Sequence, residues 1–566
     1  MIVITHRSFL PDKLKVTSWE VLEPFFTQLL EREIHSKVEL EKWLKDRSEL
    51  EAFVSEDLAW RYVRMTCDTT SKELEEAYLF FVTEIEPKVS PLNDKLNRKL
   101  VDCKFLNELD HDKYFIYLRS IKKEIEIFRE ENVPIYAEIS TESQKYGSII
   151  GSMSVEIEGK ELTLQQAANY LKNPDRNKRE EAFKKINEKR MAHANELDEL
   201  FNKLISLRHQ VAVNAGFANF RDYMFAAMGR FDYTPEDCFA FHDAIQKEIM
   251  PLVKEFTIKR EKDLGYQLRP WDMEVDTKNR AALEPFTSGS DLLDKTVNCF
   301  RKVDEYFAWC IQTMDNMDRL DLESRKGKAP GGYNYPMAET SVPFIFMNAA
   351  SSTRDVETMV HEGGHAVHSF LSKDLELSSF KSCPSEVAEL ASMSMELISY
   401  DGQDEFYKNK EDFNRAKEEH LEGIIKILPW IATIDKFQHW IYTNPTHTVD
   451  ERKNYWIALS KEFGTGLVDW SGYENIQQYG WQKQLHLYEV PFYYIEYGMA
   501  QLGALAVWRN YIHNKPKAVE QYKAALSLGY TKTIGEIYQT AGIEFNFSAT
   551  YIKELVNFVK DELKKL

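Results

Sequence analysis

A mainly α-helical fold is predicted by the apolar residues, which recur three and four positions apart along most of the 566-residue chain. Two short stretches depart from this period. Residues 153–164 alternate between apolar and polar side chains around Gly159 and Lys160, which indicates a β-hairpin. Residues 342–348 are a short apolar run, in which Pro343 favours an edge strand. The β content is therefore expected to be a small addition to a helical body.

The predicted hairpin is also the best place to divide the chain. Residues 1–150 are expected to form an N-terminal helical region, and residues 151–566 a larger region that contains the motif described below. Within the first region, Ser36 precedes a helical pattern as an N-cap. Glu39 follows it at the spacing of a capping box, in which the two residues satisfy each other's backbone N–H groups.

The composition excludes several classes of partner. A net charge of −19 gives no general attraction to nucleic acid or to an anionic membrane. The chain has no apolar run of about 18 residues, and its first residues lack the apolar core of a signal peptide. The six cysteines form no C-x-x-C pair, which fits free thiols in a reducing compartment. We expect a cytoplasmic protein with no nucleic-acid or membrane partner, and its oligomeric state is left open.

The stretch His361-Glu362-Gly363-Gly364-His365 carries the pattern H-E-x-x-H. On a helix, residues four apart lie one turn above each other, so His361 and His365 can both bind one metal ion. Glu362 lies beside them and can hold a metal-bound water as a general base. This arrangement is typical of zinc hydrolases. A helix is supported by an apolar face made of Val356, Val360, Val367 and Leu371.

The two adjacent glycines of this motif oppose helix formation, because each costs about 1 kcal/mol relative to Ala. A glycine pair inside a helical pattern indicates close approach of another backbone or of a substrate. We expect such an approach at Gly363 and Gly364.

A catalytic zinc needs a third protein ligand. A His six residues after His365 would mark the metzincin class, but that position is Leu371. His368 lies about two turns from His361, roughly 10 Å along the axis, which is too far to share the ion. We therefore expect a packing role, or a supporting role near the ligands, for His368.

An acidic third ligand is expected from residues 382–393, which read as a helix beginning near Pro384. Glu386 and Glu389 lie three apart on one face of it, and the spacing leaves both open. Glu389 is slightly favoured because it lies deeper in the helix, where a ligand is held more rigidly.

Groups that support the metal site or the reaction are expected in two places. Glu357 lies one turn before His361 and can accept a hydrogen bond from it, or it is only an exposed helix acid. Residues 473–497 are rich in tyrosine, and His486, Tyr493 and Tyr497 can donate to a developing oxyanion. The alternative for these three residues is an aromatic core.

The segment before the motif has the features of a substrate-binding element. Residues 324–336 contain Gly331 and Gly332 and are expected to form a flexible loop. The strand at residues 342–348, as an edge strand, can pair with an extended peptide by β-addition. The alternative is a surface hairpin that only leads into the helix.

Three motifs, at residues 361–368, 384–389 and 486–497, occur in this order. Together they resemble the thimet oligopeptidase superfamily, and within it the oligoendopeptidase F and Pz-peptidase branch. The similarity runs from about residue 150 to the C-terminus. The resemblance implies a mainly α zincin-type metallopeptidase with two lobes around a deep channel. It further implies an endopeptidase that holds one Zn²⁺ per chain and cleaves short peptides while excluding folded proteins.

The resemblance also implies roles for individual residues. Glu389 takes the place of the third zinc ligand beside the two histidines. His486 and Tyr497 fall where the family places groups that contact the substrate and the oxyanion, with Tyr493 and Tyr494 beside them.

The expected reaction is hydrolysis of an internal peptide bond by zinc-activated water, with Glu362 as the general base. One alternative is a zinc exopeptidase, either a peptidyl-dipeptidase or an aminopeptidase, which needs a fixed group to bind a terminal charge. The other is a catalytically inactive peptide-binding protein. The latter is disfavoured because the base and all three ligand candidates are present.

Overall fold

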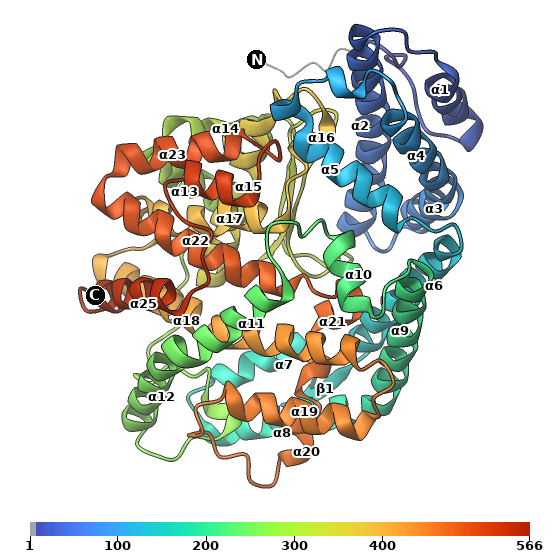
Figure 1. The fold of residues 1–566 in the computed structure, drawn as a ribbon. Helices are drawn as coiled ribbons and strands as arrows, with labels where there is room; N and C mark the ends of the chain where they lie inside the picture. The colour runs from blue at the N-terminus through green and yellow to red at the C-terminus, as the bar shows by residue number, and fades with distance from the viewer. Residues whose placement is uncertain (1–6) are drawn as a thin grey trace.

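The computed structural model describes residues 7–566. The N-terminal region is helical, as predicted, and Figure 1 shows its first helices packed together at the upper right. The helices of this region are α1 (Trp19–Glu31), α2 (Lys37–Cys67), α3 (Lys72–Phe80), α4 (Glu86–Val101), α5 (His111–Ile127) and α6 (Asn132–Gly151).

Helix α2 begins at the predicted cap, but one partner in that cap differs. The Ser36 hydroxyl accepts a hydrogen bond from the Glu39 backbone N–H. The Glu39 carboxylate accepts from the His35 N–H at 2.8 Å. The predicted capping box is therefore wrong by one residue, because Glu39 reaches past Ser36 to the preceding N–H.

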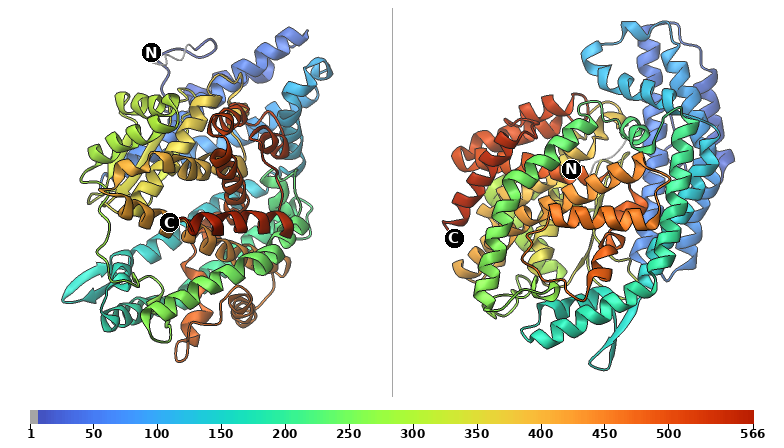
Figure 2. Two further views of the ribbon diagram at one scale, coloured as in Figure 1. Left: turned by 90° about the vertical axis from the view of Figure 1, so that its left-hand side faces the viewer. Right: turned by 60° about the horizontal axis from the view of Figure 1, so that its bottom comes forward.

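The predicted hairpin is confirmed. Strands β1 (Ser154–Ile157) and β2 (Lys160–Thr163) pair in antiparallel fashion. The turn is made by Glu158 and Gly159, with φ of 54° and 75°, the left-handed conformation that tight hairpins require. Figure 2 shows this hairpin projecting from the body of the molecule, at the lower left of the left-hand view.

Eight α-helices lie between the hairpin and the next strand, and the longest of them, α9, runs beside α6 on the right of Figure 1. Their bounds are α7 (Leu164–Ala168), α8 (Arg176–Ala192), α9 (Ala194–Asn214), α10 (Phe220–Ala227), α11 (Pro235–Ala244), α12 (Met250–Leu264), α13 (Gly289–Val303) and α14 (Glu305–Asn316).

A three-stranded sheet packs beside the H-E-x-x-H helix, and it corrects one prediction. Its strands, in spatial order, are β3 (Leu320–Glu323), β5 (Phe344–Ala349) and β4 (Tyr333–Tyr335). Strand β5 is parallel to β3 and antiparallel to β4, so it lies in the middle and the predicted edge position is wrong. Pro343 immediately precedes β5 and removes no hydrogen bond from its ladders.

The edge strand β4 comes from the segment that was expected to be a flexible loop. Its Tyr333 ring stacks on Phe346 of β5, with centroids 4.8 Å apart. The Tyr333 hydroxyl is hydrogen-bonded to Thr66 of α2 at 2.6 Å. The expectation of a loop is wrong here because aromatic side chains favour a strand, and because both the sheet and the N-terminal region hold this one.

The C-terminal part contains the H-E-x-x-H helix, α15, and the helices that surround it in Figure 1. Their bounds are α15 (Thr353–Ser372), α16 (Ser378–Lys381), α17 (Ser385–Ile398), α18 (Lys410–Thr443), α19 (Val449–Glu462), α20 (Glu474–Gln478), α21 (Leu485–Glu489), α22 (Tyr494–His513), α23 (Lys515–Ser527), α24 (Ile534–Thr540) and α25 (Ala549–Leu563).

The largest hydrophobic core extends from Tyr146 to Val559. The N-terminal helices have a core of their own, which also takes in Leu377 and Phe380. A smaller cluster joins α2 to the sheet and consists of Ala59, Val63, Met337, Phe344 and Phe346. The predicted boundary at residue 150 stays a prediction.

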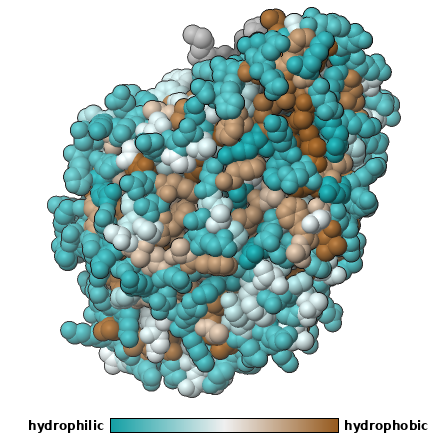
Figure 3. Space-filling model, viewed as in Figure 1, coloured by the Kyte–Doolittle hydropathy of each residue, from teal (hydrophilic) through white to brown (hydrophobic). Residues whose placement is uncertain are grey.

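The surface is mostly hydrophilic on the face shown in Figure 3, where hydrophobic residues gather over the N-terminal helices at the upper right. Across residues 7–566, no helix combines the length and the hydrophobicity needed to cross a bilayer.

Helices α15 and α17 pack so closely that glycine is required at their contact. A Cβ on Gly364 would lie 2.7 Å from Ser392 Cα and 2.8 Å from the Ala391 carbonyl oxygen, both in α17. A Cβ on Gly363 would lie 2.6 Å from the ring of Phe300 in α13. The expected close approach is confirmed, by a backbone at Gly364 and by an aromatic ring at Gly363.

We predict that Gly364→Ala lowers the free energy of unfolding by about 1–3 kcal/mol, because the added methyl group forces α15 and α17 apart. Urea denaturation of the purified protein measures the change.

Gly423→Ala is the matched control, since Gly423 lies exposed in the interior of α18 with no atom within 4 Å of a Cβ placed there. This control should gain up to about 1 kcal/mol through helix propensity. Equal behaviour of the two variants would contradict the close contact.

Candidate active site

The H-E-x-x-H segment lies in the middle of α15, which begins with a complete capping box. The Ser352 side chain accepts from the Asp355 N–H, and the Asp355 carboxylate accepts from the Ser352 N–H. His361 and His365 lie one turn apart with ring centroids 5.0 Å apart. The helix therefore presents two imidazoles on one face, as the spacing predicts.

Helix α17 brings a carboxylate against these two rings. Glu389 Oε2 lies 3.3 Å from His361 Nε2 and 3.8 Å from His365 Nε2. One ligand atom from each residue lies within 4.8 Å of the other two. With metal–ligand bonds of about 2.0–2.2 Å, a tetrahedral site places its ligand atoms roughly 3.4 Å apart. Two imidazole nitrogens and a carboxylate oxygen at this spacing fit a zinc ion that keeps one position open.

Glu386, the other ligand candidate, points elsewhere. Its carboxylate accepts a hydrogen bond from the Tyr233 hydroxyl at 2.5 Å, and only 2% of the residue is exposed. The structure brings Glu389, and not Glu386, to the two histidines.

Glu362 lies on α15 directly after the first histidine and is 7% exposed. Its backbone carbonyl accepts a hydrogen bond from the Asn334 side chain of β4 at 3.1 Å. Burial raises the pKa of its carboxyl to about 7, although His361 opposes the change. A hydrogen bond therefore links the edge strand β4 directly to Glu362, the candidate general base.

Two expected tyrosines and His486 gather on the opposite side of Glu389. The Tyr493 hydroxyl donates to Glu389 Oε1 at 3.1 Å. The Tyr497 ring lies 5.2 Å from the Tyr493 ring and 5.9 Å from the His486 ring, between centroids. The structure therefore brings all three together, with Tyr493 bonded to the candidate metal ligand itself.

Hydrogen bonds determine which nitrogen of His486 carries the proton. The Trp430 indole N–H, which can only donate, is bonded to Gln484 Oε1 at 3.0 Å. The Gln484 amide nitrogen must then face His486, and it lies 2.7 Å from Nδ1. Nδ1 therefore accepts, and in neutral His486 the proton is on Nε2. Burial lowers the pKa of His486, which favours this neutral form.

His368 does not join the ligand group. It is 5% exposed, and its Nδ1 lies 3.9 Å from the Cys383 sulfur. Burial lowers its pKa to about 3. The packing role expected for it matches this position.

Two family models match the chain over most of its length. Residues 169–557 match the model of peptidase family M3, and residues 9–128 match the peptidase M3 N-terminal domain. The chain belongs to peptidase family M3.

Similar proteins of this family carry oligopeptidase names. An oligoendopeptidase F homolog of Borreliella burgdorferi is 23% identical over 536 residues, which cover 89% of this chain and 87% of that protein. Oligopeptidase PepF of Bacillus subtilis is 25% identical over 233 residues, covering 40% of this chain and 33% of that protein.

Solved structures agree with this assignment. The structure of PZ peptidase A with an inhibitor superposes with a TM-score of 0.91 at 25% identity, covering 99% of both chains. Oligoendopeptidase F from Enterococcus faecium has the same fold, with a TM-score of 0.64 at 16% identity over 97% of both chains. The predicted mainly α metallopeptidase fold is confirmed. The chain is a metallo-oligopeptidase that acts on peptides.

One residue of this M3 peptidase was missed by the sequence analysis. Glu396 lies two turns after Glu389 on α17, and its Oε1 is 2.6 Å from His361 Nδ1. Its other oxygen is 2.8 Å from His420 Nε2, and His420 Nδ1 is 2.6 Å from the Tyr400 hydroxyl. The sequence signal that could have revealed Glu396 is its spacing of seven residues from Glu389, which puts both acids on one helix face. Glu357, which the sequence analysis offered as a hydrogen-bond partner of His361, forms an ion pair with Arg354 instead.

The surroundings hold two of the three candidate ligands, Glu389 and His365, in the protonation states that bind metal. Against its burial, hydrogen bonds to Glu389 and Glu396 raise the pKa of His361, so a metal ion has to displace a proton from this ring. Burial raises the pKa of Glu389, but hydrogen bonding to His361 and the histidine charges outweigh it and lower the pKa to about 2. The pKa of Glu396 is lowered to about 2 in the same way, against its burial, by His361 and His420. Burial lowers the pKa of His365 to about 4. Charged carboxylates and a neutral imidazole are what a metal ion requires.

We predict that Glu396→Gln weakens zinc affinity by about 10–100-fold, because it removes the charge that orients and polarises His361. Competition with a fluorescent zinc chelator measures the affinity.

Glu357→Gln on the neighbouring helix is the control and should bind zinc like the wild type. An equal loss in both variants, or a loss in the control alone, would show that Glu396 does not support the ligand.

Proposed function

We propose that this M3 chain is a zinc-dependent oligoendopeptidase that hydrolyses internal bonds of short peptides. The observation that carries the proposal is the convergence of His361, His365 and Glu389, with Glu362 beside them. These three residues would hold the ion, whose chemistry is to lower the pKa of a bound water and to polarise the substrate carbonyl. His₂Glu ligation with a neighbouring carboxylate favours zinc over harder metals.

In the proposed mechanism, Glu362 holds the attacking water and accepts its proton. As the water oxygen bonds to the carbonyl carbon, the proton passes to the Glu362 carboxylate. When the C–N bond breaks, the same proton goes to the leaving amine, which restores the base. The low exposure of Glu362 supports this role. A base shielded from solvent passes its proton to the substrate before it can lose it to bulk water.

The negative charge on the former carbonyl oxygen needs donors, and we assign these to His486 Nε2–H and the Tyr497 hydroxyl. Tyr493 has a different part, since its hydroxyl is already bonded to Glu389 Oε1. We assign Tyr493 to holding the third ligand in place. Its expected contact with the oxyanion stays a prediction.

We assign substrate pairing to β4 in place of the predicted strand. Strand β5 has neighbours on both sides, while β4 pairs with it along one edge only. Asn334 connects β4 to the carbonyl of Glu362. An extended peptide added to β4 would therefore run past the base.

A hollow of about 690 Å³ is lined by Lys483, the residue before Gln484, but by none of the candidate metal ligands or oxyanion donors. Trp430 lines it and also holds Gln484, the partner of His486. Its volume is in the range of ligand pockets, and its lining is mainly apolar and aromatic. We propose that it receives apolar side chains of the peptide.

Lys483 and Arg190 in the wall of this hollow keep exopeptidase activity as the second candidate. Either cation can bind the terminal carboxylate of a peptide. Such a fixed charge is what a peptidyl-dipeptidase requires.

The test is hydrolysis of a quenched peptide of about ten residues, blocked at both ends, with the cut located by mass. We expect an internal cut that a chelator abolishes and added zinc restores. Trimming of free-ended peptides alone would support the exopeptidase candidate. No hydrolysis of either peptide by zinc-loaded protein would overturn the proposal.

For the same peptide, Glu362→Gln should lower kcat by about 10²–10⁴-fold, because the amide cannot accept the proton. Its zinc content should stay that of the wild type. Glu357→Gln, one turn before His361 on the same helix, should retain activity. Near wild-type cleavage by Glu362→Gln would mean that the base is another residue.

Gln484→Glu tests the role of His486 through its tautomer. A carboxylate at residue 484 only accepts, so it would move the proton of neutral His486 from Nε2 to Nδ1 and remove one oxyanion donor. We expect kcat to fall by about 10²-fold above the His486 pKa. The ratio of variant to wild-type kcat should recover as the pH falls through that pKa, because the imidazolium has N–H groups on both nitrogens.

The groups facing His486 are Tyr493, Tyr494 and Tyr497, with Glu389 behind them. The tyrosines stay neutral over this range because burial raises each pKa. A matched pH–kcat profile of wild type and variant measures the effect. Parallel profiles would leave His486 with a structural role only.

A further inference from the structure

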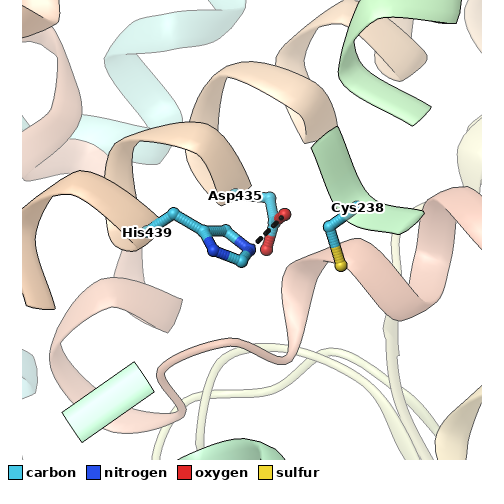
Figure 4. Close-up of side chains that lie close together, drawn as sticks. All are labelled: Cys238, Asp435 and His439. Carbon is cyan, nitrogen blue, oxygen red and sulfur yellow. Dashed lines mark ion pairs between the residues drawn. The ribbon is translucent and has the colours of Figure 1, made fainter. Parts of the chain in front are cut away.

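A second group of metal-binding side chains lies between α11 and α18. Cys238 and His242 are one turn apart on α11, and Asp435 and His439 are one turn apart on α18. All four are buried, with exposed fractions of 0%, 1%, 0% and 3% in that order. Figure 4 shows Cys238, Asp435 and His439 close together, with the His439 ring facing the carboxylate.

The donor atoms of three residues in this group are close enough to surround one ion. One ligand atom each from Cys238, Asp435 and His439 lies within 4.8 Å of the other two. Asp435 Oδ2 is 2.8 Å from His242 Nε2 and 3.2 Å from His439 Nε2. Zinc bonds of about 2.0–2.3 Å place tetrahedral ligand atoms roughly 3.3–3.6 Å apart. His242 is not part of that set of three, so the proposed site requires its ring to move toward the other ligand atoms.

Several polar atoms of the group have no hydrogen bond within the described part of the chain. They are Asp435 Oδ1, His242 Nδ1 and both ring nitrogens of His439, of which Nε2 has only its 3.2 Å ion-pair contact with Asp435. Unpaired polar atoms at this depth cost about 1–3 kcal/mol each. A bound metal ion would give these atoms partners.

The charges of the group point to a divalent cation. Among residues 7–566, Asp435 forms ion pairs with His242 and His439 alone, and neither Lys nor Arg reaches it. A thiolate and a carboxylate carry two negative charges, and neutral imidazoles add none. One Zn²⁺ would make the buried site neutral, which removes the cost of an unpaired buried charge. Sulfur among the ligands favours zinc over calcium or magnesium.

We propose that Cys238, His242, Asp435 and His439 form a second zinc site, closed and structural, separate from the catalytic site. Four protein ligands leave no open position for water, so this ion takes no part in hydrolysis. It would fasten α11 to α18, the helix that also carries His420 and Trp430. The pattern is C-x₃-H on one helix and D-x₃-H on the other.

The first test is zinc content, measured by mass spectrometry after dialysis against buffered zinc. We expect two zinc ions per wild-type chain. The double variant His361→Ala/His365→Ala should keep one, because it removes only the catalytic ligands. One ion in the wild type and none in the double variant would overturn the proposal.

The second test uses cobalt, since only the proposed site has a sulfur ligand. Cobalt-loaded protein should show a near-ultraviolet thiolate-to-cobalt charge-transfer band, and Cys238→Ser should remove it. Two other cysteines serve as controls: Cys310, which is equally buried, and Cys383, which lies beside His368. Cys310→Ser and Cys383→Ser should keep the band.

Either of two results would overturn the assignment: absence of the band in the wild type, or its loss with Cys383→Ser and survival with Cys238→Ser. If Cys238→Ser does not fold, the wild-type zinc content and the wild-type cobalt band decide the question. Both readouts are independent of peptidase activity, so a failure here leaves the catalytic proposal untouched.

Discussion

The close contact between α15 and α17 at Gly364 is the constraint on which the rest of the site depends. With α17 backbone atoms less than 3 Å from the position of a Cβ at residue 364, a short Glu side chain on α17 reaches both imidazoles of α15. Glu389 and Glu396 lie two turns apart on that helix, so the same approach brings the proposed third ligand and the partner of His361 to the site. A wider helix pair, with side chains interposed, would separate these groups by several ångströms.

Hydrogen bonds on both sides of this helix contact hold further residues of the site in fixed orientations. On one side, Glu396 connects His361 to His420 and Tyr400. On the other, Trp430 determines how Gln484 faces His486. His420 and Trp430 both come from α18, so a single 34-residue helix supports the candidate metal ligands and the proposed oxyanion donor. Such preorganised groups need no rearrangement when charge develops in the reaction.

Local signals in the sequence predicted local structure well. The H-E-x-x-H helix and the hairpin depend on periods and turns within a few residues, and both are present. Choosing between Glu386 and Glu389 was not possible from spacing, because it depends on how α17 is rotated against α15. The position of β5 was missed because Pro343 was read as part of the strand. The pairs on α11 and α18 are far apart in the sequence, and only the fold brings them together.

Pairing of the substrate with β4 would make recognition depend on the peptide backbone more than on side chains. Ladder hydrogen bonds need N–H groups and an extended L-backbone at alternate positions. The chain would then process peptides of widely different sequence. Hydrolysis would also be blocked by main-chain changes at a paired position, such as N-methylation, a D-residue or a proline. Resistance of a peptide to this enzyme would thus be determined by its main-chain chemistry.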